Sequence, residues 1–559
     1  MDIQQEQHSP SARDLPTELI VAFGHCLDGH SLAASLRVCH HWYNALIPVV
    51  WHSITRPQWQ HSNFPIHQPT GLQQQQREQD RYTGELPPTL VHVRQLEWCC
   101  NMSEQGEDRV SFTGTRLNAL TTATLARILQ STPNLVSLSL TIKVYFPDVA
   151  HAQALLKLKR LKRLVYDRSY SLREVNPTPL QDLFPLFSQL DELAIPSSAW
   201  TRNEREELEE NGGFLLPAGQ NPWRFKRLEV ARGNLALLGL CSDRTMKELV
   251  IYREYVVVNS KELSHSFLPI LRFSHLESIR IAIDQAPGQQ EDVVLVLSSL
   301  RRVRELFLEV FTIEALDFLN LPPTTVVSAR QTPMVPEEWR RQDVRREDPG
   351  QGQGNIEDGS DVDDDGLMVL PRLEDLTIHF IRPLVVESRS IIFRRLVMTR
   401  PRLKTFVVTN HDVNPDILFE ESRTRSESDG WVCKDLETLN LCFPKSIYSK
   451  TPEGLDCIWR LIYGQISKLR KLKVLSLRCV GLQRTINGGI NLLAGASCLQ
   501  ELTMIDVRFL KWTEEEVELL LPFVPRLKTF SLGPLRDDAF LHVASWLVDH
   551  GRPDVRLVR

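Results

Sequence analysis

The sequence predicts an α/β protein: a short N-terminal helical module followed by an irregular solenoid, with parallel strands on its concave side and helices on its convex side. A six-residue pattern, apolar-x-x-apolar-x-apolar, recurs thirteen times between residues 135 and 532. Apolar residues at helical spacing precede several copies, as in residues 124–129 and 391–396. One strand-plus-helix unit cannot bury its apolar side alone, whereas stacked units can, so this repetition indicates a solenoid.

The N-terminal module begins with a predicted helix near Pro16, which suits a first helical turn, with Asp14 as a possible cap. Leu19 and Phe23 follow at helical spacing, and the chain breaks at Asp28-Gly29.

A second predicted helix begins with Ser31 as its cap and ends at Pro48. Its apolar residues fall at steps of four and three and form one stripe: Leu32, Leu36, Cys39, Tyr43 and Leu46. A unit this short cannot bury both stripes within itself, so it should cap the neighbouring domain or dock onto another protein.

This segment resembles an F-box, whose pattern is Leu-Pro-x-Glu-Leu, Leu-Asp, Ser-Leu, Val-Cys-x-x-Trp and Pro-x-x-Trp. The matching residues are Leu15, Pro16, Glu18, Leu19, Leu27, Asp28, Ser31, Leu32, Val38, Cys39, Trp42, Pro48 and Trp51. Gly24 and His25 depart from it, since an apolar residue or a better helix former is usual there. The resemblance implies a surface and core that bind a Skp-type adaptor, itself joined to a cullin–RING core: Leu15, Pro16, Leu19, Leu27, Leu32, Val38 and Trp42.

Within each hexad, the fourth and sixth residues should point inward and the third and fifth outward. All but one of the intervals between copies fall between 21 and 36 residues, and the exception, 70, corresponds to two units plus an insertion. Residues 93–98 are a possible atypical first copy. Outward phase gives the expected substrate-binding residues: Arg163, Glu229, Arg280, Glu309, Thr377, His379, Asn440, Ser476, Arg478 and Thr503.

The hexads resemble the leucine-rich-repeat family, although the Asn or Cys usual after each strand is mostly missing; Lys143, Ser169, His411 and Pro444 stand there. Irregular turns are therefore expected, because those backbone amides need other partners. An F-box followed by such repeats is similar to F-box leucine-rich-repeat proteins. That resemblance implies the substrate-recognition subunit of an SCF-type (Skp–cullin–F-box) ubiquitin ligase; the alternative is a repeat scaffold or inhibitor-like binder without a ubiquitylation role.

The two resemblances, together with composition, divide the chain into an F-box-like segment at 10–54, a linker at 55–90 and a leucine-rich-repeat-like solenoid at 91–559. The linker carries a glutamine run and several prolines but few large apolar residues. Residues 331–367 end in an acidic, glycine-rich stretch with little to bury, and we expect a disordered insertion there.

Several classes of function are excluded. A net charge of −5 and a pI near 6.4 argue against nucleic-acid or anionic-membrane binding. No apolar run reaches the roughly 18 residues of a membrane helix, and the start lacks the features of a secretory signal. Ten scattered cysteines favour a reducing compartment, cytoplasmic or nuclear, without a disulfide framework.

No enzyme, cofactor or metal site is expected either. The stretch around Ser31 imitates a G-x-S-x-G nucleophile elbow, but the residues before it are helical in pattern and do not form a buried strand. Asp361, Asp363 and Asp365 imitate the start of a calcium loop whose twelfth position is Arg372, where a bidentate acid is required.

Overall fold

In the structure, a computed structural model, the chain forms two compact units. Unit 1 comprises Met1–Met246 and Val250–Val257, and unit 2 comprises Lys247–Leu249 and Val258–Arg559. The residues that it describes are 15–50, 52–54, 88–100, 125–142, 149–168, 180–196, 222–252, 268–283, 296–297, 299–310, 370–384, 390–418, 431–443, 451–479, 485–506, 514–531 and 537–558. The acidic insertion, Asp14, most of the linker, and Lys143, Ser169 and Pro444 lie outside these residues.

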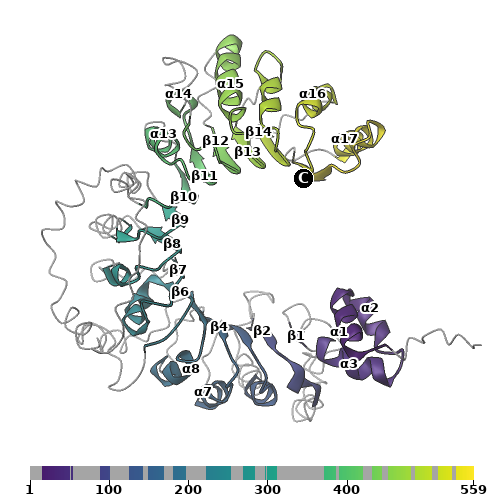
Figure 1. Cartoon of the computed structure of the whole chain (residues 1–559), viewed down its shortest axis with the longest axis vertical. Coiled ribbons are helices and arrows are strands. Elements are labelled where there is room, and N and C mark those ends of the chain that lie inside the picture. The colour runs from purple at the N-terminus through teal and green to yellow at the C-terminus, as the bar shows by residue number, and fades with distance from the viewer. Residues whose placement is uncertain are drawn as a thin grey trace, which may run out of the picture. The chain divides into compact units, whose positions relative to one another are not determined.

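Unit 1 begins with three short helices, α1 (Thr17–Cys26), α2 (Gly29–Ser35) and α3 (His40–Val50), which we call the head (Figure 1). The start of α2 differs from the prediction. The cap of α2 is Asp28, whose carboxylate accepts the Ser31 amide at 2.8 Å, so Ser31 itself lies inside the first turn.

The predicted single helix after residue 31 is wrong, because the chain turns between α2 and α3. Leu36 and Cys39 lie on either side of this turn, and both pack against the core of the head. Pro48 lies inside α3 and does not end it. The helix stops two residues later, so the proline removes a hydrogen bond only in its last turn.

The core of the head consists of Ile20, Trp42, Ala45 and Leu46. The glycine at position 24, which departs from the F-box pattern, lies close to α3: a Cβ there would be 2.4 Å from Leu46 Cδ2. The close approach of α1 to α3 therefore favours glycine over a better helix former.

The strands of unit 1 follow one another in chain order and pair in parallel wherever the register is defined. They are β1 (Ser53–Ile54), β2 (Gln95–Cys100), β3 (Ser137–Ile142), β4 (Arg163–Arg168), β5 (Glu192–Ile195), β6 (Arg227–Ala231) and β7 (Glu248–Tyr252), the last containing residues of both units. Between them lie η1 (Pro88–His92), α7 (Val149–Leu156), η2 (Leu180–Leu183), α8 (Phe184–Phe187) and η3 (Arg232–Leu240). The 3-10 helix η1 begins at Pro88, so the last three residues of the predicted linker, 88–90, are helical.

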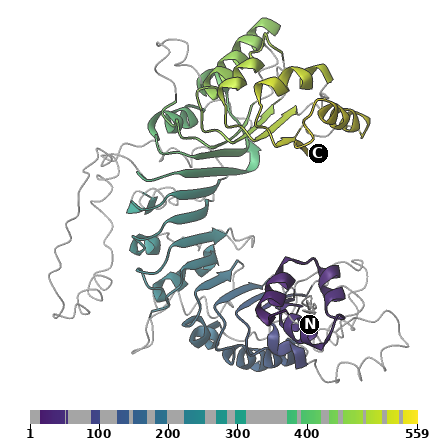
Figure 2. The same ribbon diagram turned by 45° about the vertical axis from the view of Figure 1, so that its right-hand side comes forward.

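Unit 2 repeats this plan with η4 (Leu268–Arg272), β8 (Ser278–Ile283), β9 (Glu305–Val310), β10 (Asp375–Leu384), α13 (Ser390–Thr399), β11 (Thr405–Asp412), α14 (Pro415–Leu418), β12 (Thr438–Cys442), α15 (Pro452–Ile466), β13 (Val474–Cys479), η10 (Ile490–Gly495), β14 (Glu501–Asp506), α16 (Glu514–Leu520), η11 (Leu521–Phe523), β15 (Thr529–Ser531), α17 (Asp537–Asp549) and β16 (Arg556–Val558). Its strands lie side by side as parallel rungs (Figure 2), and its helices cover one side of the sheet (Figure 1).

One hydrogen-bond motif recurs at the start of the strands and fixes their register. The carbonyl of Glu374, which precedes β10, accepts the amides of Lys404 (2.7 Å) and Thr405 (3.0 Å) at the start of β11. The Arg94 carbonyl accepts Val136 and Ser137 in the same way at the start of β3. Because one carbonyl holds two consecutive amides of the next repeat, adjacent hexads are locked in phase and their apolar positions stack.

All thirteen predicted hexads form strands, and residues 93–98 form β2 as proposed. Inward positions such as Leu376 and Ile378 are fully buried. The reading of the 70-residue interval as two units plus an insertion is wrong, since β9 pairs directly with β10 and no repeat strand lies between them. The register shifts part-way along the pairing of β10 with β11 and along the pairing of β11 with β12, and His411 takes part in the shifted pairing with β10. These shifts are local irregularities of the repeat. The short strands β1 and β16 were not predicted.

Candidate functional site

The head exposes an unusual share of large apolar side chains. Leu15, Leu19 and Phe23 are 38%, 56% and 51% exposed; Leu19 and Phe23, four residues apart, share one side of α1, and Leu15 lies just before the helix. Val38, before α3, and Tyr43, on α3, are also exposed. These five, which we call the docking residues, are half of the ten exposed large hydrophobic side chains among the described residues.

Other contacts hold the docking residues in place. The Phe23 ring meets Trp42 edge-on, with centroids 6.0 Å apart. His41 Nε2 hydrogen-bonds the carbonyl oxygen of Leu15 at 3.0 Å, joining α3 to the start of α1. The exposed apolar side of α1 is therefore carried by a rigid helix pair and not by a loose terminus.

The predicted adaptor residues separate into surface and core. Pro16 and Val38 are exposed, as are Leu15 and Leu19, whereas Leu27 and Leu32 are half-buried. Trp42 is only 7% exposed and belongs to the core of the head, so it supports a docking surface from below. Phe23 and Tyr43 were missed; both lay on predicted apolar stripes, and the sequence did not show which side of each stripe faces solvent.

On the sheet of unit 2, strand register aligns most of the predicted substrate residues. Consecutive partners from β8 to β14 form the first row, and all of them point away from the inward positions: Arg280, Phe307, Thr377, Val407, Asn440, Ser476 and Thr503. A second row, two residues further along the strands, contains Glu309, His379 and Thr409, and Arg478 lies opposite Cys442. We call these two rows the open face.

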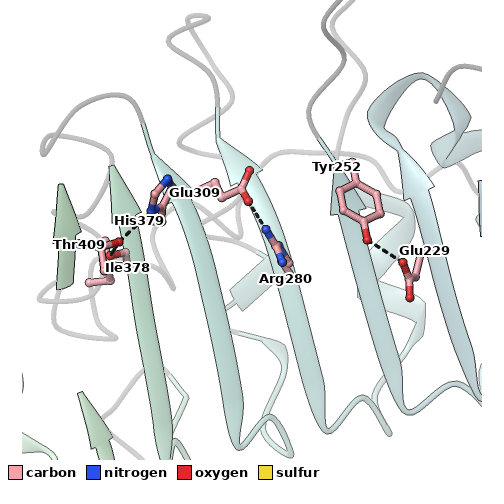
Figure 3. Close-up of polar contacts among 7 residues, drawn as sticks. All are labelled: Glu229, Tyr252, Arg280, Glu309, Ile378, His379 and Thr409. Carbon is pink, nitrogen blue, oxygen red and sulfur yellow. Dashed lines mark hydrogen bonds and ion pairs between the residues drawn. The ribbon is translucent and has the colours of Figure 1, made fainter. Parts of the chain in front are cut away.

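Arg280, Glu309 and His379 of the open face are paired with neighbouring side chains (Figure 3). Arg280 forms an ion pair with Glu309, and its guanidinium lies 4.0 Å from the centroid of the Phe307 ring. His379 Nδ1 hydrogen-bonds Thr409 Oγ1 at 2.7 Å. Phe307 was not predicted, although a large aromatic residue at the outward fifth position of its hexad was a visible signal.

The predicted residues of unit 1 are paired as well. Glu229 accepts hydrogen bonds from Arg227 Nε at 2.8 Å and from the Tyr252 hydroxyl at 2.6 Å (Figure 3). Arg163 Nε lies 3.3 Å from Glu192 Oε2, and both side chains are about half exposed. Such an exposed pair contributes little to stability, so its charges remain available to a partner.

The described residues contain little that could perform chemistry. Ser31 lies in the first turn of α2 with its hydroxyl donating to Asp28 at 3.2 Å, so it does not stand at the strand-to-helix turn of a nucleophile elbow. No group of three His, Cys, Asp or Glu side chains there is placed to hold a metal ion. Within the same residues, no helix is both long enough and apolar enough to cross a bilayer.

Comparison with known proteins finds likeness in structure alone. No protein-family model matches the sequence, and no curated protein matches it. Similar solved structures include TLR13 in its complex with ssRNA13 (TM-score 0.37, 13% identity, 80% of this chain and 54% of that one) and a leucine-rich-repeat protein of Leptospira interrogans (0.29, 12%, 77% and 92%). An internalin of Listeria monocytogenes is a third (0.25, 10%, 84% and 81%). The chain thus spans about half the length of the TLR13 chain, and its repeat architecture is established by its own strand register.

Proposed function

We propose that this protein is a non-catalytic, protein-binding repeat protein that serves as the substrate-recognition subunit of an SCF-type ubiquitin ligase. In this proposal the head binds a Skp-type adaptor, which connects the chain to a cullin–RING core. The repeat array holds a protein substrate near the charged ubiquitin-conjugating enzyme and raises its effective concentration. The observation that carries the proposal is the concentration of exposed apolar side chains on the head.

Exposed apolar residues on a small helical head support docking because they do not help it fold. The core of the head is complete without Leu19 and Phe23, whose side chains are about half exposed. Apolar surface gathered in this way is typical of protein interaction sites. The order and spacing of the F-box-like residues support a Skp-type adaptor as the partner of the head.

The open face supports a protein as the second partner. Its charges are of both signs, with Arg280 paired to Glu309, and from β12 to β14 its first row is short and neutral, with Asn440, Ser476 and Thr503. A nucleic-acid surface would instead need a run of unpaired cations.

The first experiment is a pull-down of a purified Skp-type adaptor and cullin by the full chain and by a Leu19→Ala/Phe23→Ala variant. Both side chains lie outside the core, so the variant should fold as the wild type does. We expect at least about tenfold weaker adaptor binding, because buried interface aromatics and leucines commonly contribute more than 1.4 kcal/mol each.

The matched control is Leu541→Ala, which removes a leucine that is 65% exposed on α17, far along the chain. It should bind the adaptor normally. Equal adaptor binding by all three proteins, or none by the wild type, would refute head docking. Recovery of adaptor without cullin would instead favour the repeat scaffold without a ubiquitylation role.

The substrate surface is tested separately with Ser476→Arg, which places a long side chain in the neutral part of the open face. Ser476 is half-buried beside Asn440 and Thr503, so the new side chain must project outward over them. Proteins that are captured by the wild type, lost with Ser476→Arg and retained with Leu19→Ala/Phe23→Ala are substrate candidates. Loss of adaptor binding in Ser476→Arg would show that the two surfaces are not independent.

A further inference from the structure

A cavity of about 310 Å³ lies in unit 1 where the head meets the first repeat. Its floor is apolar, with Val21, Pro48 and Val49 from the head and Val91 from η1. Neither the docking residues nor the open face contribute to it. Its function is therefore separate from both surfaces in the proposed function.

The polar side chains around this cavity have a marked bias in charge. His25 comes from the last turn of α1, His52 follows α3, His92 ends η1 and Arg94 immediately precedes β2. None of the twelve lining residues is acidic. Four protonatable or cationic side chains from four segments therefore surround one cavity without a carboxylate among them.

These groups also lack partners in the described parts of the chain. No hydrogen bond or ion pair there engages the side chains of His25, His52, His92 or Arg94, although the His52 carbonyl accepts the Arg94 amide at 3.0 Å. The pKa of His52 is lowered below its usual 6.5 by burial first, and then by the positive charges of Arg94 and His25. Arg94 and His25 thus place positive charge near His52, none of the described lining residues is acidic, and an anion in the cavity would be favoured.

We propose that this cavity binds a small organic anion, in which a phosphate monoester or carboxylate group meets Arg94 and the three histidines while an apolar part rests on the valine floor. Charge-assisted hydrogen bonds from Arg94 and from protonated imidazoles supply the affinity. The volume is at the lower end of the range for small-molecule sites, which limits the ligand to a small group. A metal ion is not the ligand, because no three donors among the described residues are placed to hold one.

Binding should be tighter at pH 6 than at pH 8. The anion favours the charged imidazole, so binding raises the pKa of His52 from its lowered value, and by linkage a lower pH strengthens binding. The groups that face the bound anion are His25 from α1, His52 after α3, His92 from η1 and Arg94 from the start of β2; Arg94 is charged at both pH values, and none of the lining residues is acidic.

The test is calorimetric titration of the full chain with phenyl phosphate, which combines an apolar ring with a phosphate monoester whose charge is about −1.5 to −2 at pH 7, using phenol and inorganic phosphate for comparison. We expect Kd to rise about tenfold or more in Arg94→Gln and in His52→Gln, since each loses one charge-assisted contact. Arg37→Gln and His40→Gln are the matched controls: both residues are exposed on the head and neither lines the cavity. The His52 substitution leaves in place the backbone carbonyl that holds β2, so this variant keeps its fold.

Three results would overturn the proposal: no binding of phenyl phosphate at pH 6, equal affinity for phenol, or equal affinity in Arg94→Gln and Arg37→Gln. A rise in the His52 pKa on addition of phenyl phosphate, followed by NMR of histidine-labelled protein, would support it directly. A phosphotyrosine peptide distinguishes the sources of the ligand. Tighter binding of the peptide than of phenyl phosphate indicates a phosphorylated protein side chain, and weaker binding indicates a free small molecule.

Discussion

Arg400 is a cation at a position that the other repeats of unit 2 fill with uncharged side chains. It follows α13, three residues before the first residue of its hexad, and is only 5% exposed. Its Nη1 donates to the Leu370 carbonyl at 2.9 Å, whereas its Nε has no partner among the described residues. The equivalent residues in the other repeats of unit 2 are buried and uncharged: Phe273, Leu300, Leu370, Cys433, Leu469, Ala496 and Val524.

The cost of this buried charge follows from its pKa. Burial lowers the pKa of Arg400 from its usual value to about 10, with no opposing contribution from a nearby carboxylate. At about 1.36 kcal/mol per unit, burying the charged form costs roughly 3 kcal/mol. Arg400→Met would lose one hydrogen bond, worth about 1 kcal/mol, while the Leu370 carbonyl keeps the Leu373 amide at 3.2 Å. We therefore expect the variant to raise the free energy of unfolding by about 2 kcal/mol.

The assay is urea unfolding followed by circular dichroism, in which a higher midpoint at an unchanged slope reports a gain in stability. Arg372→Met is the matched control: Arg372 is exposed, two residues after Leu370 in the preceding repeat, and the change should stay within about 0.5 kcal/mol. The gain should be the same from pH 6 to 9. Because the folded-state pKa is near 10 and the pKa in the unfolded chain is higher still, both states are protonated in that window, and the cost is relieved only above it.

A loss of stability in Arg400→Met, with Arg372→Met unchanged, would refute this reasoning. It would show that an anion compensates the guanidinium and that the pair, once broken, leaves a buried charge or an empty site.

Three further predictions concern burial, capping and thiol reactivity. Leu475→Ala should cost about 2–5 kcal/mol in urea unfolding while the adjacent Ser476→Ala costs under about 0.5 kcal/mol, which checks the inward and outward phase of β13. Asp28→Ala should destabilise the head by about 0.5–2 kcal/mol through the lost cap of α2, seen as earlier thermal melting; an unchanged melt would contradict the capping role. Burial raises the pKa of Cys433 to about 12, so at pH 8 an alkylating reagent should label the exposed Cys26 and spare Cys433 until urea unfolds the chain, as read by mass spectrometry.

The repeat architecture could be predicted from the sequence because its signal is local and is repeated. In each hexad the apolar fourth and sixth positions identify the buried side without any knowledge of the partner strands, as Leu376 and Ile378 illustrate. The bulges in β10 and β11 could not be predicted, because they depend on how two neighbouring strands leave register. β16 was missed since a strand of three residues carries too little pattern.

The head shows where periodicity stops being informative. Leu19 and Phe23 have helical spacing, and so do Ile20 and Gly24, which form the side that is buried. Spacing alone does not choose between two such sides when both are apolar. The choice is made by Gly24, whose missing side chain lets α1 approach Leu46, and that contact is visible only in three dimensions.

Pairing on the open face was equally invisible in the sequence. Arg280 and Glu309 are 29 residues apart, and they meet because β8 and β9 are neighbours in register. The cavity beside His52 was missed for the same reason, since its four charged or protonatable residues come from four segments, and lone histidines in a sequence give no signal.

The contrast between the two sides of the strands indicates where specificity resides. The inward residues are apolar in one repeat after another, so any one of them could be exchanged for another apolar residue of similar size without changing the fold. The outward residues share no chemistry: Arg280 and Phe307 give way to the short neutral side chains of Asn440, Ser476 and Thr503. Folding does not require that gradient, because half-exposed residues contribute little to stability. A partner that matches it would meet an ion-paired arginine and an aromatic ring on β8 and β9 and short uncharged side chains on β12 to β14, a pattern that a uniform polyanion does not complement.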